Sequence, residues 1–155
     1  MTAPRIVRRG DGDVVPGEHW LFKAVASNTG GLFDFMVGPV ERFTGPPLHV
    51  HAEQSDTFLV LEGHLTIQIV DEMHELGPGD FATVPPGVPH TFDNVQDGGE
   101  QVLAVNVMVP GGLHAFFEKR AEVGDGASRE ELRGLAETFG MTVVGPPLRT
   151  TLGVG

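Results

Sequence analysis

Residues 45–56, GPPLHVHAEQSD, place two of the chain's seven histidines one residue apart, in a tract that we predict to be the end of a β-strand. Side chains at positions i and i+2 of a strand point to the same side, with Cα atoms roughly 6.6–6.8 Å apart. His49 and His51 can therefore converge on one metal ion, each with a ring nitrogen about 2.0–2.1 Å from it. Asp56 has the opposite parity, so it joins them only if residues 52–55 form a bulge or turn.

A second tract, GDFATVPPGVPHTFDN at residues 79–94, supplies a third histidine. A predicted strand ends there in a Pro-Pro-Gly turn, and His90 begins the next strand with Phe92 and Asn94 on its own side. A lone H-x-H pair is also typical of a solvated or hydrogen-bonded surface, so the second tract is what favours a metal site. Together the three histidines and one carboxylate form a ligand set that leaves positions open for solvent.

The two tracts together resemble the two-motif signature of the cupin superfamily. The first has the pattern G-x3-H-x-H-x4-D-x6-G and ends at Gly63, and the second has the pattern G-x5-P-x-G-x2-H-x3-N from Gly79 to Asn94. The resemblance covers roughly residues 20–110 and implies an all-β fold, a jelly-roll (double-stranded β-helix) barrel with a metal inside its mouth. The metal ligands that it implies are His49, His51, Asp56 and His90.

The first motif departs from the cupin pattern at two places. Three residues rather than five separate Gly45 from His49, and the acid is Asp56 where the family usually has glutamate. Aspartate is one methylene shorter, so its carboxylate reaches up to about 1.5 Å less far. Asp56 ligates directly if the backbone moves inward, and otherwise it serves as a base beside a shell of three histidines and water. Glu53 and Gln54 lie close enough to substitute for it, although solvated loop positions are the simpler expectation.

The composition limits which cofactors and which classes of partner the chain can have. Because the chain has no cysteine, nitrogen and oxygen alone hold any metal, and one divalent ion of Fe, Ni, Co, Mn, Cu or Zn is the expected cofactor. The net charge of −11, from 10 basic and 21 acidic residues, argues against a nucleic acid partner. No apolar run approaches the roughly 20 residues that span a bilayer, and no apolar segment follows the N-terminal arginines. We therefore expect no membrane partner and a cytoplasmic location.

Short apolar runs alternate with glycine and proline turns between residues 21 and 109, which is typical of an antiparallel sandwich or barrel. We expect an N-terminal arm over residues 1–20, a cupin barrel over 21–110 and a helical extension with a tail over 111–155. An antiparallel sandwich of this size leaves edge strands that need cover, so we also expect a homodimer. The N-terminal segment MTAPRIV is the candidate to pair across its interface.

The clearest helix is predicted over residues 129–139. Ser128 is its N-cap, Glu131 completes a capping box and Gly140 ends the helix. Apolar residues at helical spacing predict the face that packs on the outside of the barrel: Leu132, Leu135, Ala136 and Phe139. The tract LHAFFEKRAEV is a candidate for a shorter helix and MTVV for an edge strand, whereas the tail PPLRTTLGVG carries no legible signal.

Three phenylalanines predict the character of a substrate pocket. Phe58 and Phe92 share parity with Asp56 and His90, and Phe43 lies near the start of the first motif. Each one is equally consistent with barrel core, but together they predict an apolar wall beside the metal. Such a pocket suits a small aromatic or polyketide-like molecule better than a phosphorylated sugar.

Within the superfamily, the stretches PPLHVH, FLVLEG and LGPGDFATVPPGVPH are similar to the small single-domain cupins of the quercetinase-like dioxygenase group. That resemblance implies an enzyme whose metal binds the deprotonated enol oxygen of an aromatic substrate, whose general base is Asp56, and in which O2 attacks the activated ring. Two alternatives stay open. One is a non-redox cyclase or isomerase that uses the metal as a Lewis acid, and the other is a small-molecule-binding cupin without catalysis.

Overall fold

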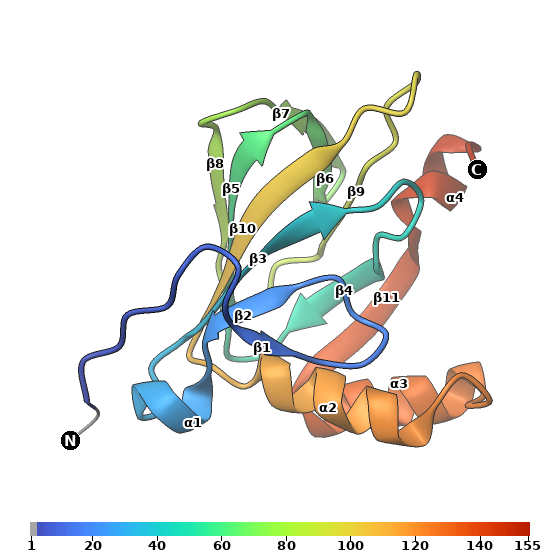
Figure 1. Ribbon diagram of the computed structural model, residues 1–155. Helices are drawn as coiled ribbons and strands as arrows, with labels where there is room; N and C mark the ends of the chain where they lie inside the picture. Colours follow the sequence, from blue (N-terminus) through green and yellow to red (C-terminus); the bar gives the residue numbers. More distant parts are fainter. Residues whose placement is uncertain (1–2) are drawn as a thin grey trace.

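Two antiparallel β-sheets face each other in the computed structural model, which describes residues 3–155 (Figure 1). One sheet has six strands in the order β1-β2-β3-β10-β5-β8, and the other has five in the order β11-β4-β9-β6-β7. The strands are β1 (Asp13–Val14), β2 (Leu21–Ala24), β3 (Asp34–Val40), β4 (Pro47–His51), β5 (Ser55–Glu62), β6 (Leu65–Ile69), β7 (Glu72–Leu76), β8 (Phe81–Val84), β9 (His90–Asp93), β10 (Val102–Val109) and β11 (Met141–Pro147). The helices are α1 (Ala26–Thr29), α2 (Leu113–Val123), α3 (Arg129–Thr138) and α4 (Leu148–Leu152). The antiparallel barrel predicted from the strand spacing is thus confirmed.

The barrel core lies between the two sheets and follows from the alternation of side chains along each strand. In β5, Phe58 and Val60 are fully buried, whereas Leu59 and Leu61 on the other side are partly or largely exposed. Buried residues of other strands complete this apolar cluster: Val40, Leu65, Ile67, Val84, Val102 and Ala104. A second cluster joins the six-stranded sheet to α2 and contains Val15, Phe22, Val25, Met36 and Met108, with Leu113 and Phe117 packed against it.

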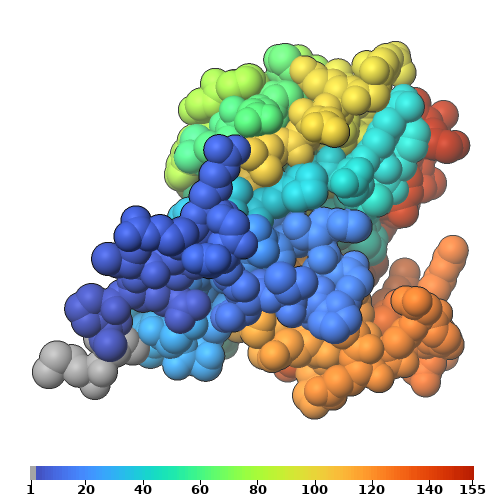
Figure 2. All heavy atoms as spheres, viewed as in Figure 1, coloured from blue at the N-terminus to red at the C-terminus, as the bar shows by residue number. Residues whose placement is uncertain are grey.

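The two longer helices lie outside the barrel, as predicted for the second of them, and Figure 2 shows both in orange along one side of the molecule. Ser128 Oγ accepts a hydrogen bond from the Glu131 N–H (3.2 Å), and Glu131 Oε2 accepts one from the Ser128 N–H (2.8 Å), which confirms the capping box. Helix α3 ends at Thr138, one residue earlier than predicted, and Gly140 follows with a φ of 74°. The candidate helix LHAFFEKRAEV is α2. In residues 3–155, no helix is long and apolar enough to cross a membrane.

Strand β11 extends the sheet that carries the paired histidines. It contains the predicted edge strand MTVV and runs three residues further, to Pro147. Its register places Met141 opposite His51 and Val143 opposite His49. The C-terminal part of the chain therefore covers the edge of β4, as Figure 1 also shows.

The tail, for which no sequence signal is legible, forms α4 and anchors a loop of the first motif. Leu148 is fully buried, and Arg149 donates to the Gly45 carbonyl (2.9 Å) while lying 3.6 Å from the buried Asp93 carboxylate. Glycine is required at position 45, because a Cβ atom there would lie 1.9 Å from the Phe92 carbonyl oxygen. The motif glycine thus lets the loop before β4 pass directly over β9.

The N-terminal arm contacts its own chain. Arg5 Nε donates to the Lys23 carbonyl (2.9 Å), and Lys23 Nζ donates to the carbonyls of Arg8 and Arg9 (both 2.8 Å). The first two residues of the segment MTAPRIV lie outside the described residues. Pairing of this segment across a homodimer stays a prediction.

Candidate metal centre

Four buried side chains from the two motifs come together inside the barrel. His49 and His51 lie on β4, Asp56 near the start of β5 and His90 at the start of β9, and the ligand atoms all lie within 4.8 Å of one another. The pairing of β4 with β9 places His49 directly opposite His90. Residues 52–54 join β4 to β5, and this turn brings Asp56 round to the side of the histidines.

The separations between the ligand atoms fit a single ion. His49 Nε2 lies 3.2 Å from His51 Nε2. Asp56 Oδ2 lies 3.1 Å from His90 Nε2 and 3.6 Å from His51 Nε2. Two ligands that are each about 2.0–2.1 Å from one ion lie roughly 2.8–3.4 Å apart at octahedral or tetrahedral angles. The first two separations fall in this range, the third is slightly longer, and no separation within the set exceeds 4.8 Å. A small inward movement of the side chains therefore brings the four atoms to the spacing of ligands around one metal.

Backbone carbonyls set the orientation of two of the rings. The Nδ1–H of His49 donates to the Pro47 carbonyl (2.8 Å), and the Nδ1–H of His90 donates to the Val88 carbonyl (2.9 Å). A carbonyl can only accept, so each ring carries its proton on Nδ1 when neutral and turns the lone pair of Nε2 toward the cluster. This arrangement is the one that metal-binding histidines use, because the second ring nitrogen holds the ring in place.

The charges of the cluster are coupled. Burial, together with the charges of the neighbouring His90 and His51, lowers the pKa of His49 to about 4. Burial alone would raise the pKa of Asp56, but hydrogen bonds with His51 and His90 outweigh it and hold that pKa well below its ordinary value. Burial opposes a charge on His90 as well, yet the Asp56 carboxylate raises its pKa above the ordinary value. The cluster therefore contains an ionised carboxylate that keeps a proton on His90.

Asn106 of β10, which was not among the residues predicted from the motifs, also belongs to the site. Its side-chain amide donates to Asp56 Oδ1 and to the Thr57 carbonyl (3.2 Å), and the residue is 4 % exposed. The available sequence signal was a polar residue in the otherwise apolar strand VLAVNVMV. Its partner Asp56 is 50 residues away in the chain, so no local pattern connects the two.

Glu53 and Gln54 lie in the turn, away from the ligand cluster. Glu53 is exposed, and Gln54 Nε2 donates to the Pro110 carbonyl (3.0 Å). Both residues line a surface groove of about 410 Å³ between the turn, the end of β10 and the end of α3. They are the loop residues that the sequence led us to expect.

The three phenylalanines predicted as a pocket wall occupy two places. Phe58 and Phe92 pack against each other in the barrel core, with ring centroids 4.8 Å apart, two residues along their strands from the ligand positions. The Phe43 N–H donates to the carbonyl of Asn94 (3.2 Å), which follows the last residue of β9. Phe43 therefore lies beside the end of β9 that is opposite to His90. Contact of any of these rings with a substrate stays a prediction.

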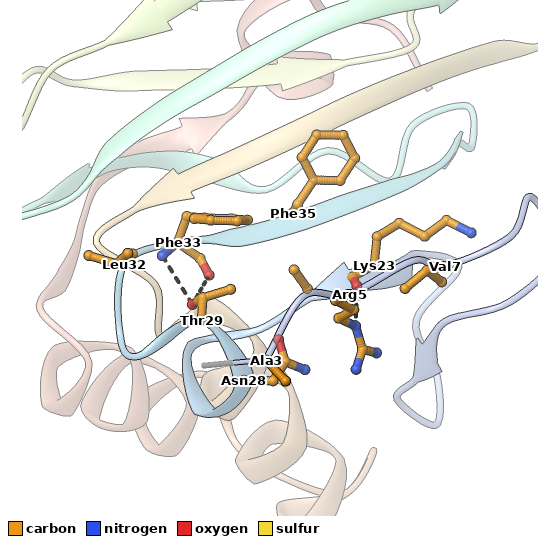
Figure 3. Close-up of a pocket in the computed structure, with 10 residues that line it drawn as sticks. Ala3, Arg5, Val7, Lys23, Asn28, Thr29, Leu32, Phe33 and Phe35 are labelled. Atoms are coloured by element: carbon orange, nitrogen blue, oxygen red, sulfur yellow. Dashed lines mark hydrogen bonds between the residues drawn. The ribbon is translucent and has the colours of Figure 1, made fainter. Parts of the chain in front are cut away.

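A surface pocket of about 510 Å³ lies apart from the cluster, beneath the N-terminal arm (Figure 3). Its walls come from the arm, β2, α1 and the segment that leads into β3, and include Arg5, Lys23, Thr29, Phe33 and Phe35. The ammonium group of Lys23 is already bound by backbone carbonyls. Among the described residues, the cluster that could hold a metal lies in the barrel interior and shares no residue with the lining of this pocket.

The family model described as "Cupin domain" matches residues 39–107, a range that contains all four buried ligand candidates. The chain contains a cupin domain. The chain is also similar to a "Quercetin 2,3-dioxygenase" of Bacillus subtilis (strain 168), which is 33 % identical over 96 residues, or 57 % of this chain and 27 % of that relative. An "Oxidoreductase OpS7" of Beauveria bassiana (strain ARSEF 2860) is 33 % identical over 79 residues, or 41 % of this chain and 26 % of that relative. The matched region is therefore about a quarter of the length of each relative.

Solved structures confirm the cupin double-stranded β-helix fold. The polyketide cyclase RemF from Streptomyces resistomycificus superposes with a TM-score of 0.58 at 22 % identity, covering 69 % of this chain and 80 % of the cyclase. A protein with a double-stranded β-helix domain from Klebsiella pneumoniae superposes with a TM-score of 0.54 at 23 % identity, covering 71 % of this chain and 93 % of that protein. At these identities the likeness concerns the fold alone.

Proposed function

We propose that this cupin is a metal-dependent dioxygenase of the quercetinase-like kind, which acts on a small aromatic enol. The observation that carries the proposal is the Asp56 carboxylate, which lies among three imidazoles inside the barrel with one oxygen turned toward them. The similarity to a quercetin 2,3-dioxygenase over 57 % of this chain supports the choice of chemistry.

The side chains that would hold the metal are His49, His51 and His90 through Nε2 and Asp56 through Oδ2. When bound, a divalent transition metal supplies Lewis acidity to an enol oxygen and a centre at which dioxygen reacts. The protein's part is to keep the His49 and His90 rings in the tautomer that leaves Nε2 free and to hold the carboxylate among the three rings. The packed rings of Phe58 and Phe92 fill the barrel beyond the cluster, so they exclude water from that side.

Asp56 Oδ2 is the atom that we propose takes the proton of the enol. In the metal-free protein the carboxylate is ionised, because His51 and His90 hold its pKa well below the ordinary value. With a metal bound, the positive charge of the ion would favour the ionised form instead. A carboxylate of low pKa is a weak base, so it accepts a proton only from a hydroxyl that is already acidified beside the metal. Positioned proton transfer of this kind contributes typically about 10²- to 10⁴-fold to a rate.

Oxygen uptake in the presence of a flavonol tests the proposal. Protein purified without a histidine tag is loaded separately with Fe(II), Ni(II), Co(II), Mn(II) or Cu(II), and oxygen consumption is followed together with the loss of flavonol absorbance. We expect turnover in at least one metal form, and a fall in kcat of about 100-fold or more for Asp56→Ala. Glu53→Ala is the matched control, because Glu53 is an exposed acid on the same turn, and it should keep the wild-type rate.

Three results would overturn the dioxygenase proposal. Absence of oxygen uptake with every metal form contradicts it outright. Conversion of an aromatic or polyketide-like substrate without oxygen uptake would instead indicate a non-redox cyclase or isomerase. Tight binding of the flavonol without conversion would indicate a small-molecule-binding cupin.

A further inference from the structure

Asn106 is the one polar side chain in strand β10. It lies on the inward row of that strand between Ala104 and Met108, both of which are fully buried. A buried amide among apolar neighbours has to find its hydrogen-bond partners within the protein, since an unmade bond there is destabilising. The partners it finds connect it to the metal centre.

The amide of Asn106 engages the strand that carries the acid. Nδ2 donates to Asp56 Oδ1 and to the backbone carbonyl of Thr57, two consecutive residues of β5. With Oδ1 occupied in this way, only Oδ2 is turned toward His90 (3.1 Å) and His51 (3.6 Å). The two carboxylate oxygens therefore have different environments, one bonded to an amide and the other facing the imidazoles.

A carboxylate without such a partner has no fixed orientation. The torsion about its Cβ–Cγ bond is broad and roughly two-fold, so an unheld Asp56 can exchange its two oxygens. Aspartate also reaches up to about 1.5 Å less far than the glutamate that usually occupies this position of the motif. A short side chain that is also free to rotate would hold its ligand atom poorly.

We propose that Asn106 is a positioning residue that presents Asp56 Oδ2, and only that oxygen, to the metal. This inference rests on the proposed metal-dependent function and adds the residue that lets an aspartate replace the usual glutamate. Because Asn106 acts through Asp56, its effect on metal binding disappears when Asp56 is removed.

A double-mutant cycle measures that dependence. The affinity for Co(II) alone and for Zn(II) alone is determined by competition with a chromophoric chelator for wild type, Asn106→Ala, Asp56→Ala and the double variant. We expect Asn106→Ala to weaken binding about 10- to 100-fold. Added to Asp56→Ala, it should cause no further loss. The Co(II) absorption spectrum reports the ligand set without any turnover, and for Asn106→Ala it should shift toward the spectrum of Asp56→Ala.

Asn94→Ala is the matched control. Asn94 is also a buried asparagine, 2 % exposed, whose Nδ2 donates to two backbone carbonyls, those of Val40 (3.3 Å) and Glu100 (2.9 Å), and to none of the ligand residues. We expect its loss to lower the Tm without changing the affinity for either metal. Asn106→Leu keeps the approximate size of the side chain and removes both donors, so it should reproduce the affinity loss even where the alanine variant folds poorly.

The outcomes separate this inference from the proposed function. A wild-type protein that takes up neither metal overturns both. A wild-type protein that binds metal while Asn106→Ala and Asn106→Leu bind it equally well overturns only the inference. Losses that add in the double variant overturn it too, since Asn106 would then act independently of Asp56.

Discussion

At the scale of single residues, the hydrogen bond between His90 and Asp56 makes metal binding depend on pH. The carboxylate raises the pKa of His90 in spite of its burial, so the imidazole of the metal-free protein stays protonated below that raised value. A histidine must lose this proton to ligate a metal, so the ion and the proton compete. His49, whose pKa burial lowers to about 4, is neutral above that pH and adds no further competition.

We therefore expect metal binding near pH 6 to release the proton of His90, and the affinity to rise with pH up to at least the pKa of His90. Calorimetric titrations in buffers with different heats of ionisation count the released protons. In the metal-free protein the bond between His90 and Asp56 also stabilises the fold. Its contribution is fully present below about pH 6.5, the pKa of His90 in the unfolded chain, and is lost as the pH rises through the raised pKa of His90 in the folded protein. A binding enthalpy that is independent of the buffer near pH 6 would contradict the assignment of the proton.

Replacing Asp56 by glutamate tests whether the site is built for the shorter acid. Asp56 Oδ2 already lies at ligand distance from its neighbours, 3.1 Å from His90 Nε2, and Oδ1 is held by Asn106. One more methylene pushes the carboxylate into the imidazoles and breaks the bond to the amide, so we expect Asp56→Glu to weaken metal binding by about tenfold or more. Tighter binding by Asp56→Glu in chelator competition would show instead that the barrel retains the geometry of a glutamate site.

At the scale of elements, α4, the loop before β4 and β9 form one unit that supports His90. Arg149 of α4 donates to the Gly45 carbonyl and faces Asp93 of β9, three residues after that histidine. Gly45 itself lies against the Phe92 backbone. A change at Gly45 therefore displaces the loop that leads into the histidine pair.

We expect Gly45→Ala to lower the free energy of unfolding by about 1–3 kcal/mol, since its Cβ has no room beside the Phe92 carbonyl. The displaced loop should also weaken metal binding, because β4 follows it directly. Urea denaturation and chelator competition measure the two effects. Gly126→Ala, at a position with nothing within 4 Å of the added Cβ, is the matched control and should change neither.

Local patterns predicted the elements whose determinants are close in sequence. The capping box of α3 depends on residues three apart, Ser128 and Glu131, and the histidine pair of β4 on the two-residue period of a strand. The cupin resemblance implied that His90 meets the histidine pair, but other partners distant in sequence escaped prediction. Asn106 meets an acid 50 residues earlier, and Arg149 reaches a carbonyl 104 residues earlier. The register between β-strands, which no local pattern encodes, brings such residues together.

At the scale of the whole molecule, the outer face of the six-stranded sheet is uncharged where β3, β10, β5 and β8 lie side by side. Cross-strand pairing makes one row of Val37, Val105, Leu59 and Phe81, and a second row of Phe35, Val107, Thr57 and Thr83. An antiparallel sheet usually shows polar residues on a solvated face. Two chains can therefore approach through these two rows without placing charged side chains against each other.

We expect a homodimer that forms through this face, and light scattering at high protein concentration should give twice the mass of the chain. Val107→Lys places a charge in the middle of the second row, so it should give monomers. Thr142→Lys, at an exposed position of β11, is the control and should leave the dimer intact. A wild-type chain that remains monomeric at every concentration would contradict the predicted dimer.

The metal content of protein purified without a histidine tag tests the central claim most directly. Three imidazoles and one carboxylate converge inside the barrel at the spacing of ligands around one ion. We therefore predict about one divalent transition metal per chain by elemental analysis. We also predict that His90→Ala, which removes a ligand from β9, loses most of it. A protein that is purified metal-free and then takes up none of Fe, Ni, Co, Mn, Cu and Zn would contradict the account.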